Sequence, residues 1–223
     1  MRTLWGIPGM MLVCAAVQAQ TSSVPIEPPA GKTAGESAAT VQAGANATNE
    51  AATEETRALL TRGRTLMSAE KWQEAAAVFQ RALTLEPDND DALFGLGTIY
   101  VSLERFGDAM PIFEKLLKRN PGNPFVRNNL AWIYLKTKDP ALRSPEKALR
   151  LARDAVLDVP SDANVWNTLA EAYYVSGDYQ RALRVARQYL QMLRMAGETD
   201  QTAAKELLTR CRTAAGATAE PEE

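Results

Sequence analysis

In this chain of 223 residues, acid–base chemistry would have to rely on carboxylates, lysine or tyrosine. There is no histidine, which excludes Ser-His-Asp and Cys-His relays, imidazole bases and histidine-ligated metal sites. Asp88, Asp90 and Asp91 form a cluster of carboxylates, but it stands where a helix is predicted to begin, and acidic residues are typical there. We interpret these three as helix caps. The sequence therefore predicts no catalytic residue, no metal site and no cofactor.

The two cysteines are predicted to have no redox role within one mature chain. Cys14 lies in an apolar leader, so removal of the leader would leave Cys211 alone. Cys211 shares helical spacing with Ala204, Leu207 and Leu208, which favours a small apolar side chain facing the preceding helix. The alternative is a disulfide-linked dimer.

Residues 1–19 are typical of an export signal. Arg2 precedes an uncharged apolar run from Leu4 to Val17, and cleavage after Ala19 would leave Gln20 as the mature N-terminus. Two alternatives remain: a retained leader that anchors the chain, and lipidation of Cys14. The run is shorter than the ~20 residues that span a bilayer, and bulky Val13 disfavours lipidation. The predicted location is therefore periplasmic or secreted, with a membrane-anchored form as the alternative.

Two flanking segments lack the apolar side chains that a core needs. Residues 20–53 are rich in Ala, Thr and Pro and are predicted to be a disordered linker, and residues 214–223 a disordered tail. The formal net charge of -2 gives no electrostatic case for nucleic acid or an acidic membrane surface. Membrane association would come only through a retained leader or a lipidated Cys14.

Small residues recur through the rest of the chain. Gly63, Gly97, Ala131 and Ala170 follow one another at intervals of 34, 34 and 39, and each is followed by an alanine at Ala75, Ala109, Ala148 or Ala182. A period near 34 is the length of a helix-turn-helix unit that buries its apolar face only by stacking on copies of itself. The small residues predict close approach of the two helices in each unit.

The unit resembles the tetratricopeptide repeat, whose pattern is clearest in Leu96-Gly97, Tyr100, Ala109, Phe113 and Pro121. The resemblance implies an all-α fold, a right-handed α-solenoid of four helix-turn-helix repeats with a C-terminal capping helix. The predicted repeats occupy residues 56–89, 90–123, 124–162 and 163–197, and the capping helix residues 198–213. The third unit has a short insertion between its helices.

In this family the first helices line a groove that holds a partner peptide, so their exposed positions become the candidate binding residues. They are Arg57 and Arg64 in the first unit, Asp91, Phe94 and Thr98 in the second, Phe125, Asn128, Asn129 and Trp132 in the third, and Asn164, Asn167, Glu171 and Tyr174 in the fourth. Lys136 adds a further charge to this groove. The paired-lysine and asparagine clamp by which some relatives hold a C-terminal carboxylate is not recognisable.

Amide and aromatic side chains in this set each have two interpretations. Asparagine is a weak helix former, and its amide can both donate and accept, which suits gripping a peptide backbone. Asn128, Asn129 and Asn167 are therefore candidate peptide ligands, or they are solvated or paired with each other. Trp132 is either an anchor for a partner side chain or a filler against the insertion at residues 137–143.

The sequence thus favours a non-catalytic protein–protein interaction module of the bacterial cell envelope that binds an extended peptide or partner protein. The alternative is an assembly factor or structural subunit of an envelope machine, such as a pilus, secretion or polysaccharide-export system, in lipoprotein form or otherwise. An enzyme is the third and least favoured class.

Overall fold

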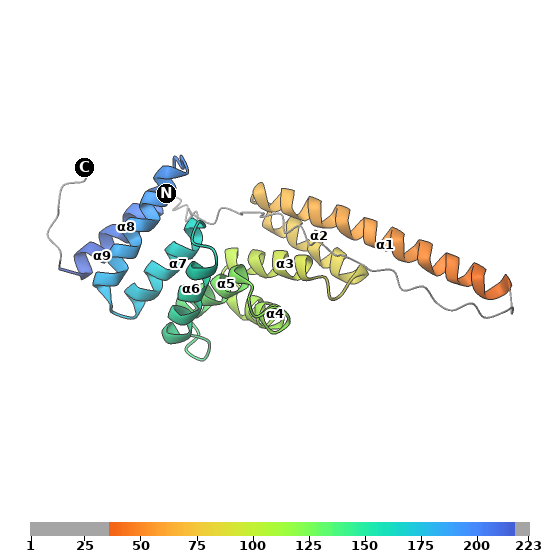
Figure 1. Cartoon of the computed structure of the whole chain (residues 1–223), viewed down its shortest axis with the longest axis horizontal. Coiled ribbons are helices and arrows are strands. Elements are labelled where there is room, and N and C mark those ends of the chain that lie inside the picture. The colour runs from red at the N-terminus through yellow and green to blue at the C-terminus, as the bar shows by residue number, and fades with distance from the viewer. Residues whose placement is uncertain (1–35, 217–223) are drawn as a thin grey trace. The chain divides into compact units, whose positions relative to one another are not determined.

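The computed structural model describes the backbone of residues 36–216 and the side chains of residues 51–216. The predicted leader, the first part of the predicted linker and the end of the tail lie outside these residues. Every regular element of the described chain is a helix (Figure 1). In chain order they are α1 (Glu36–Ser68), α2 (Trp72–Leu85), α3 (Asp90–Ser102), α4 (Phe106–Arg119), α5 (Pro124–Lys136), α6 (Pro145–Asp158), α7 (Ala163–Val175), α8 (Tyr179–Met195) and α9 (Thr202–Ala214).

The described chain divides after Asn89 into two compact units, the hairpin α1–α2 and the set α3–α9. Helix α1 has 33 residues and α2 has 14, so α1 runs well past the end of its partner (Figure 1). The linker was predicted to reach residue 53, whereas the helix begins at Glu36. The linker was predicted because this segment lacks large apolar side chains. An alanine-rich segment can nevertheless form the hydrogen bonds of a helix without burying large apolar side chains.

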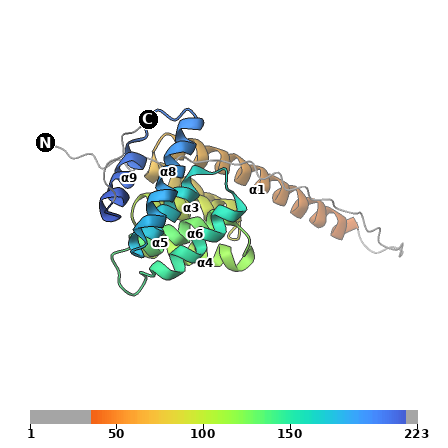
Figure 2. The same cartoon turned by 60° about the vertical axis from the view of Figure 1, so that its left-hand side comes forward.

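Within the larger unit, each first helix packs against the second helix of its own hairpin in the pairs α3–α4, α5–α6 and α7–α8. Each hairpin stacks on the next, and α9 lies beside α8 in both views (Figures 1 and 2). Asn123, Asp162 and Asp178 cap α5, α7 and α8 by accepting hydrogen bonds from backbone N–H groups of the first turn. Because the turns between them are short, consecutive helices pack side by side in antiparallel directions.

Close packing of the hairpins depends on the recurring small residues. A Cβ built on Gly63 would lie 2.6 Å from the Phe79 ring, and one on Gly97 would lie 2.9 Å from the Phe113 ring. In the third and fourth units, Ala131 and Ala170 occupy the glycine position, and Ala152 and Ala186 the phenylalanine position. All four of these alanines are fully buried. The chain therefore uses two packings, glycine with phenylalanine and alanine with alanine.

The turn after a helix has the same backbone geometry in three of the repeats. Glu70, Glu104 and Gly177 have positive φ angles of 57°, 54° and 79°. The following N–H of Lys71, Arg105 and Asp178 donates to the carbonyl of Leu66, Tyr100 and Tyr173, at 2.9, 2.8 and 3.0 Å. This is the Schellman arrangement, in which glycine is the residue without a steric cost. Sequence reasoning missed it at the two glutamates.

Glu104→Gly should therefore raise the stability of the protein. Glu104 is exposed, and its left-handed backbone costs about 1–2 kcal/mol, while glycine adds about 0.5–1 kcal/mol of unfolded-state entropy. We expect a net gain of about 0.5–1 kcal/mol in the free energy of unfolding, measured by urea titration. Gly177→Ala, at the equivalent turn, should lower the urea midpoint. Equal midpoints for the two variants would show that the left-handed turn does not strain a non-glycine residue.

Helix α9 covers the last hairpin. Its buried residues Ala204, Leu207, Leu208 and Cys211 form one cluster with Tyr189 and other buried residues of α7 and α8. Cys211 is free and fully buried, as the spacing predicted. Burial raises the pKa of its thiol to about 11; nearby Arg210 opposes this, and Glu171 adds to it.

Alkaline pH should test the burial of Cys211. An unfolded thiol ionises near a pKa of about 8.5, whereas the folded thiol keeps its proton to a pKa of about 11, so the unfolded chain loses its proton first. The stability that Cys211 contributes is complete below about pH 8.5 and is lost as pH rises toward the folded pKa of about 11. Stability should fall with pH in Cys211→Ala as well, because burial raises the pKa of Tyr189 to about 12 in both proteins. We expect the free energy of unfolding of the wild type to fall more steeply, because only the wild type carries the thiol. Identical slopes would mean that the thiol ionises freely.

Candidate functional site

First helices of the larger unit line up in sequence order. Contacts join α3 to α5, α5 to α7 and α7 to α9, so equivalent positions on the four helices form rows. One row consists of Thr98, Trp132, Glu171 and Arg210, which recur at the spacing of the repeat. We call the surface of α3, α5, α7 and α9 that carries this row the first-helix face. It is where the sequence placed the candidate binding residues of the second to fourth units.

Glu171 is the centre of an ion network on this face. Its side chain is only 8% exposed, and its two carboxylate oxygens have different partners. One oxygen lies 3.2 Å from Lys136 Nζ on α5, and the other accepts a hydrogen bond of 3.0 Å from Arg210 on α9. One carboxylate on α7 thus ties together three neighbouring helices. Because two cations share it, the network carries one excess positive charge.

Two aromatic rings complete the network. The Lys136 ammonium lies 4.6 Å from the centre of the Trp132 ring, and the Arg210 guanidinium lies 4.7 Å from the centre of the Tyr174 ring. Partial burial lowers the pKa of Arg210, but the charge and hydrogen bond of Glu171, together with Tyr174, raise it by more. The guanidinium therefore stays cationic. Cations held over rings in this way are positioned to receive a carboxylate or a carbonyl oxygen.

Two polar side chains, one on α3 and one on α5, each have a buried oxygen that forms no hydrogen bond within the described chain. Neither Thr98 Oγ1 nor Asn128 Oδ1 has a partner among the described residues, although both atoms are buried. Asn129 is different, because its amide donates to the Phe125 carbonyl at 2.9 Å within its own helix. On α7, Asn167 is half-buried and forms no side-chain hydrogen bond with any described residue. Asn128 and Asn167 thus remain candidate ligands for a peptide backbone, whereas Asn129 is used internally.

Other predicted residues fall into three groups. Phe94 turns toward the core, with its ring edge-to-face with Phe113 at 5.8 Å between centroids. Phe125 and Asn164 are half-buried on the face, and Asp91 is exposed at the start of α3. Arg57 and Arg64 belong to the separate α1–α2 hairpin, where exposed Arg57 pairs with Glu54 and Arg64 is half-buried. The structure therefore brings together Trp132, Glu171 and Tyr174 but not the whole predicted set.

Sequence reasoning missed Arg210, the residue that closes the network. It lies in the capping helix predicted over residues 198–213, which contributes none of the candidate binding residues. Its signal was the repeat itself, since Arg210 follows Glu171 at the same interval as Glu171 follows Trp132. Helix α9 thus occupies the place of a fifth first helix within the described chain.

Comparison with known families agrees with this arrangement. A family profile described as tetratricopeptide repeat matches residues 60–124 and 141–196, and a second profile of the same description matches residues 112–144. The chain belongs to the tetratricopeptide repeat family. Tetratricopeptide repeats are in general non-catalytic modules that bind protein partners, which makes a protein the expected partner class here. No curated protein sequence matches the chain.

Solved structures with the same fold confirm the predicted all-α repeat solenoid. A thermophilic tetratricopeptide repeat protein of Thermus thermophilus is 21% identical, with a TM-score of 0.59 over 72% of this chain and 83% of that one. MamA of Desulfovibrio magneticus is 19% identical, with a TM-score of 0.52 over 65% of this chain and 78% of MamA. PilF of Pseudomonas aeruginosa is 17% identical, with a TM-score of 0.54 over 74% of this chain and 78% of PilF. At these identities the likeness concerns the fold.

The described residues also lack two kinds of feature. No group of three or more His, Cys, Asp or Glu side chains among them is arranged to hold a metal ion. None of the described helices combines the length and apolar character needed to cross a bilayer.

Proposed function

We propose that this tetratricopeptide repeat chain is an exported interaction module of a bacterial cell envelope that binds an extended segment of another protein on its first-helix face. The location is supported by the sequence of residues 1–19, in which the apolar run and the predicted cleavage site after Ala19 are typical of an export signal. The mode of binding is supported by the family and by the row of polar and aromatic side chains on α5, α7 and α9.

The observation that carries the proposal is the network of Lys136, Glu171 and Arg210. Glu171 forms an ion pair with both cations, yet an ammonium has three N–H donors and a guanidinium five, so donors remain for a ligand. The Lys136 and Arg210 side chains are 33% and 45% exposed, so a ligand can reach them. A bound segment would set carbonyl or carboxylate oxygens on these donors, with Asn167 gripping its backbone.

A capture experiment tests the binding face. The full chain, expressed with its leader in an envelope-bearing host and tagged at its C-terminus, is cross-linked, purified and compared with Arg210→Ala/Asn167→Ala by quantitative mass spectrometry. We expect the captured partner to fall at least about tenfold, the usual effect of removing interface side chains that a ligand engages. Lys138→Ala, an exposed cation of the insertion, is the matched control and should capture as much as the wild type. A partner captured equally by all three proteins would remove the first-helix face from the proposal.

Processing of the leader is a separate test. N-terminal sequencing of the exported protein should begin at Gln20, and osmotic release should place it in the periplasm. A chain that keeps Met1, or that carries lipid on Cys14, would favour the membrane-anchored alternative. Stable sedimentation with the outer membrane, together with capture that ignores the face variants, would instead favour a structural subunit of an envelope machine.

A further inference from the structure

A short arginine-bearing phrase occurs twice in the second helices of the larger unit. Residues 148–153 read Ala-Leu-Arg-Leu-Ala-Arg on α6, and residues 182–187 read Ala-Leu-Arg-Val-Ala-Arg on α8, one repeat length later. The alanines of both copies are fully buried. The two arginines of each copy are exposed. Equivalent positions of α2 and α4 carry Ala77, Gln80, Pro111 and Glu114, so the arginines are particular to the last two repeats.

Three of these arginines have charges that the protein does not neutralise. Arg150, Arg153 and Arg184 form no ion pair with any described residue, whereas Arg187 has an interaction within the protein. Helix α8 contains no acidic residue, and on α6 the one carboxylate between Arg150 and Leu157 is that of Asp154. Elsewhere the solenoid does pair its arginines across helices, as in Arg127 with Asp158 at 2.5 Å. The contrast marks a local excess of positive charge on a chain whose net charge is -2.

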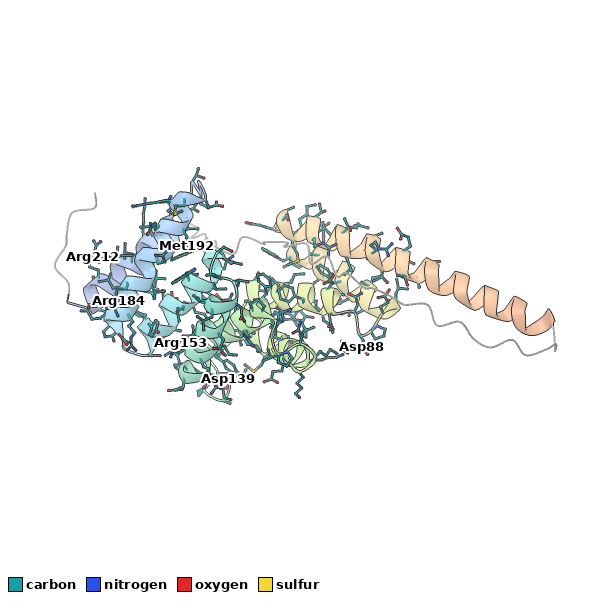
Figure 3. All side chains as sticks on the ribbon, viewed as in Figure 1. Asp88, Asp139, Arg153, Arg184, Met192 and Arg212 are labelled. Carbon is teal, nitrogen blue, oxygen red and sulfur yellow. The ribbon has the colours of Figure 1, made fainter. Side chains whose placement is uncertain are left out.

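The two copies occupy equivalent positions in successive repeats. Contacts join α6 to α7 and α7 to α8, and stacked repeats present equivalent positions on the same side of the solenoid. Val185, which follows Arg184, packs against a buried cluster that α5, α6 and α7 share. Figure 3 labels Arg153 on α6 and Arg184 on α8. We call the surface of Arg150, Arg153, Leu157 and Arg184 the arginine face. It lies on second helices, apart from the first-helix face.

An apolar side chain stands beside these charges. Leu157 is 79% exposed, one helical turn after Arg153, and is one of only three large apolar residues that the described chain exposes. An exposed leucine beside unpaired arginines is the composition of a protein contact, in which one apolar anchor is flanked by charges that set register. A membrane surface would need a broad apolar stripe, which the exposed faces of α6 and α8 do not present.

We propose that the arginine face is a second docking surface that binds an acidic segment of a partner protein, with carboxylates on Arg150, Arg153 and Arg184 and an apolar side chain on Leu157. The module would thereby hold two protein segments at once, one on each side of its last two repeats. This goes beyond the proposed function of the first-helix face and does not depend on it.

A displayed library of random peptides is the probe. It is selected on the purified full chain and on Arg153→Glu/Arg184→Glu, and the enriched peptides are measured by fluorescence anisotropy. Lys138→Glu/Lys205→Glu is the control, because it makes the same change of net charge on exposed cations of the insertion and of α9, outside the second helices. Circular dichroism and urea unfolding check that both variants fold, and Arg153→Gln/Arg184→Gln replaces the reversal if it does not.

We expect wild-type selection to enrich peptides that combine Asp or Glu with Leu, Ile or Phe. Their affinity should fall at least about tenfold in the arginine variant and by about fivefold in Leu157→Ala. The lysine control should stay within about twofold, and Arg210→Ala/Asn167→Ala should leave these peptides bound, which separates this face from the first-helix face. Enrichment without acidic residues, no enrichment, or equal binding by the arginine and lysine variants would overturn the proposal. The proposal would also be overturned if the protein co-sedimented with phosphatidylglycerol vesicles while no enriched peptide lost affinity in the arginine variant.

Discussion

Gly97→Ala and Phe113→Ala together are expected to cost less stability than the two single substitutions added. Phe113→Ala alone should lower the free energy of unfolding by about 3–5 kcal/mol, since its fully buried ring would leave a cavity. Gly97→Ala alone should lower it by about 1–3 kcal/mol, because the new Cβ would lie 2.9 Å from that ring. In the double variant the Cβ enters the space that the ring has left. The coupling should therefore be favourable by about 1–3 kcal/mol.

The last two repeats already contain the double variant. Ala131 with Ala152 and Ala170 with Ala186 are fully buried pairs at the same two positions. Gly107→Ala is the control for helix propensity, because Gly107 lies in a helix with open space around it. It should gain about 0.5–1 kcal/mol. Urea unfolding of the four proteins of the cycle gives the coupling, and strict additivity would mean that Gly97 is not kept small by the Phe113 ring.

Removal of α9 is expected to make the protein associate more strongly than the whole chain does. A chain that ends at Glu198 would uncover the apolar cluster of α7 and α8, including Tyr189 and Leu190, which are 1% and 4% exposed in the whole chain. Repeat arrays need a terminal element with a polar outer face, and an uncovered apolar patch drives association. Light scattering after size exclusion should show oligomers or aggregate.

A point variant keeps this prediction testable if the shortened chain is insoluble. Leu207→Ala removes buried methyl groups from the α9 contact and should cost about 2–5 kcal/mol in urea unfolding. Lys205→Ala, on the exposed side of the same helix, is the matched control and should stay within about 0.5 kcal/mol of the wild type. If Leu207→Ala also left the free energy of unfolding unchanged, the contact of α9 with the last hairpin would not stabilise the protein.

Part of the candidate site was accessible from the sequence and part was not. Trp132, Glu171 and Tyr174 were placed on the binding face because a repeat carries the same position into every copy. Phe94 occupied such a position too, but its ring packs on Phe113, and only the neighbouring helix decides which way a side chain turns. Sequence reasoning misses Arg210 because the predicted repeats end at Gly197, whereas α9 continues the row.

Sequence alone determined that this chain is all-α and built of stacked hairpins. Packing of two helices requires small residues at their closest approach, and Gly63, Gly97, Ala131 and Ala170 recur at the length of one hairpin. Tertiary structure alone decided that Glu70 and Glu104 adopt left-handed turns and that Glu171 unites Lys136 with Arg210. A turn forced by the helices on both sides overrides the preference of its own residue. An ion pair between positions so far apart in the chain exists only when stacking brings their two helices into contact.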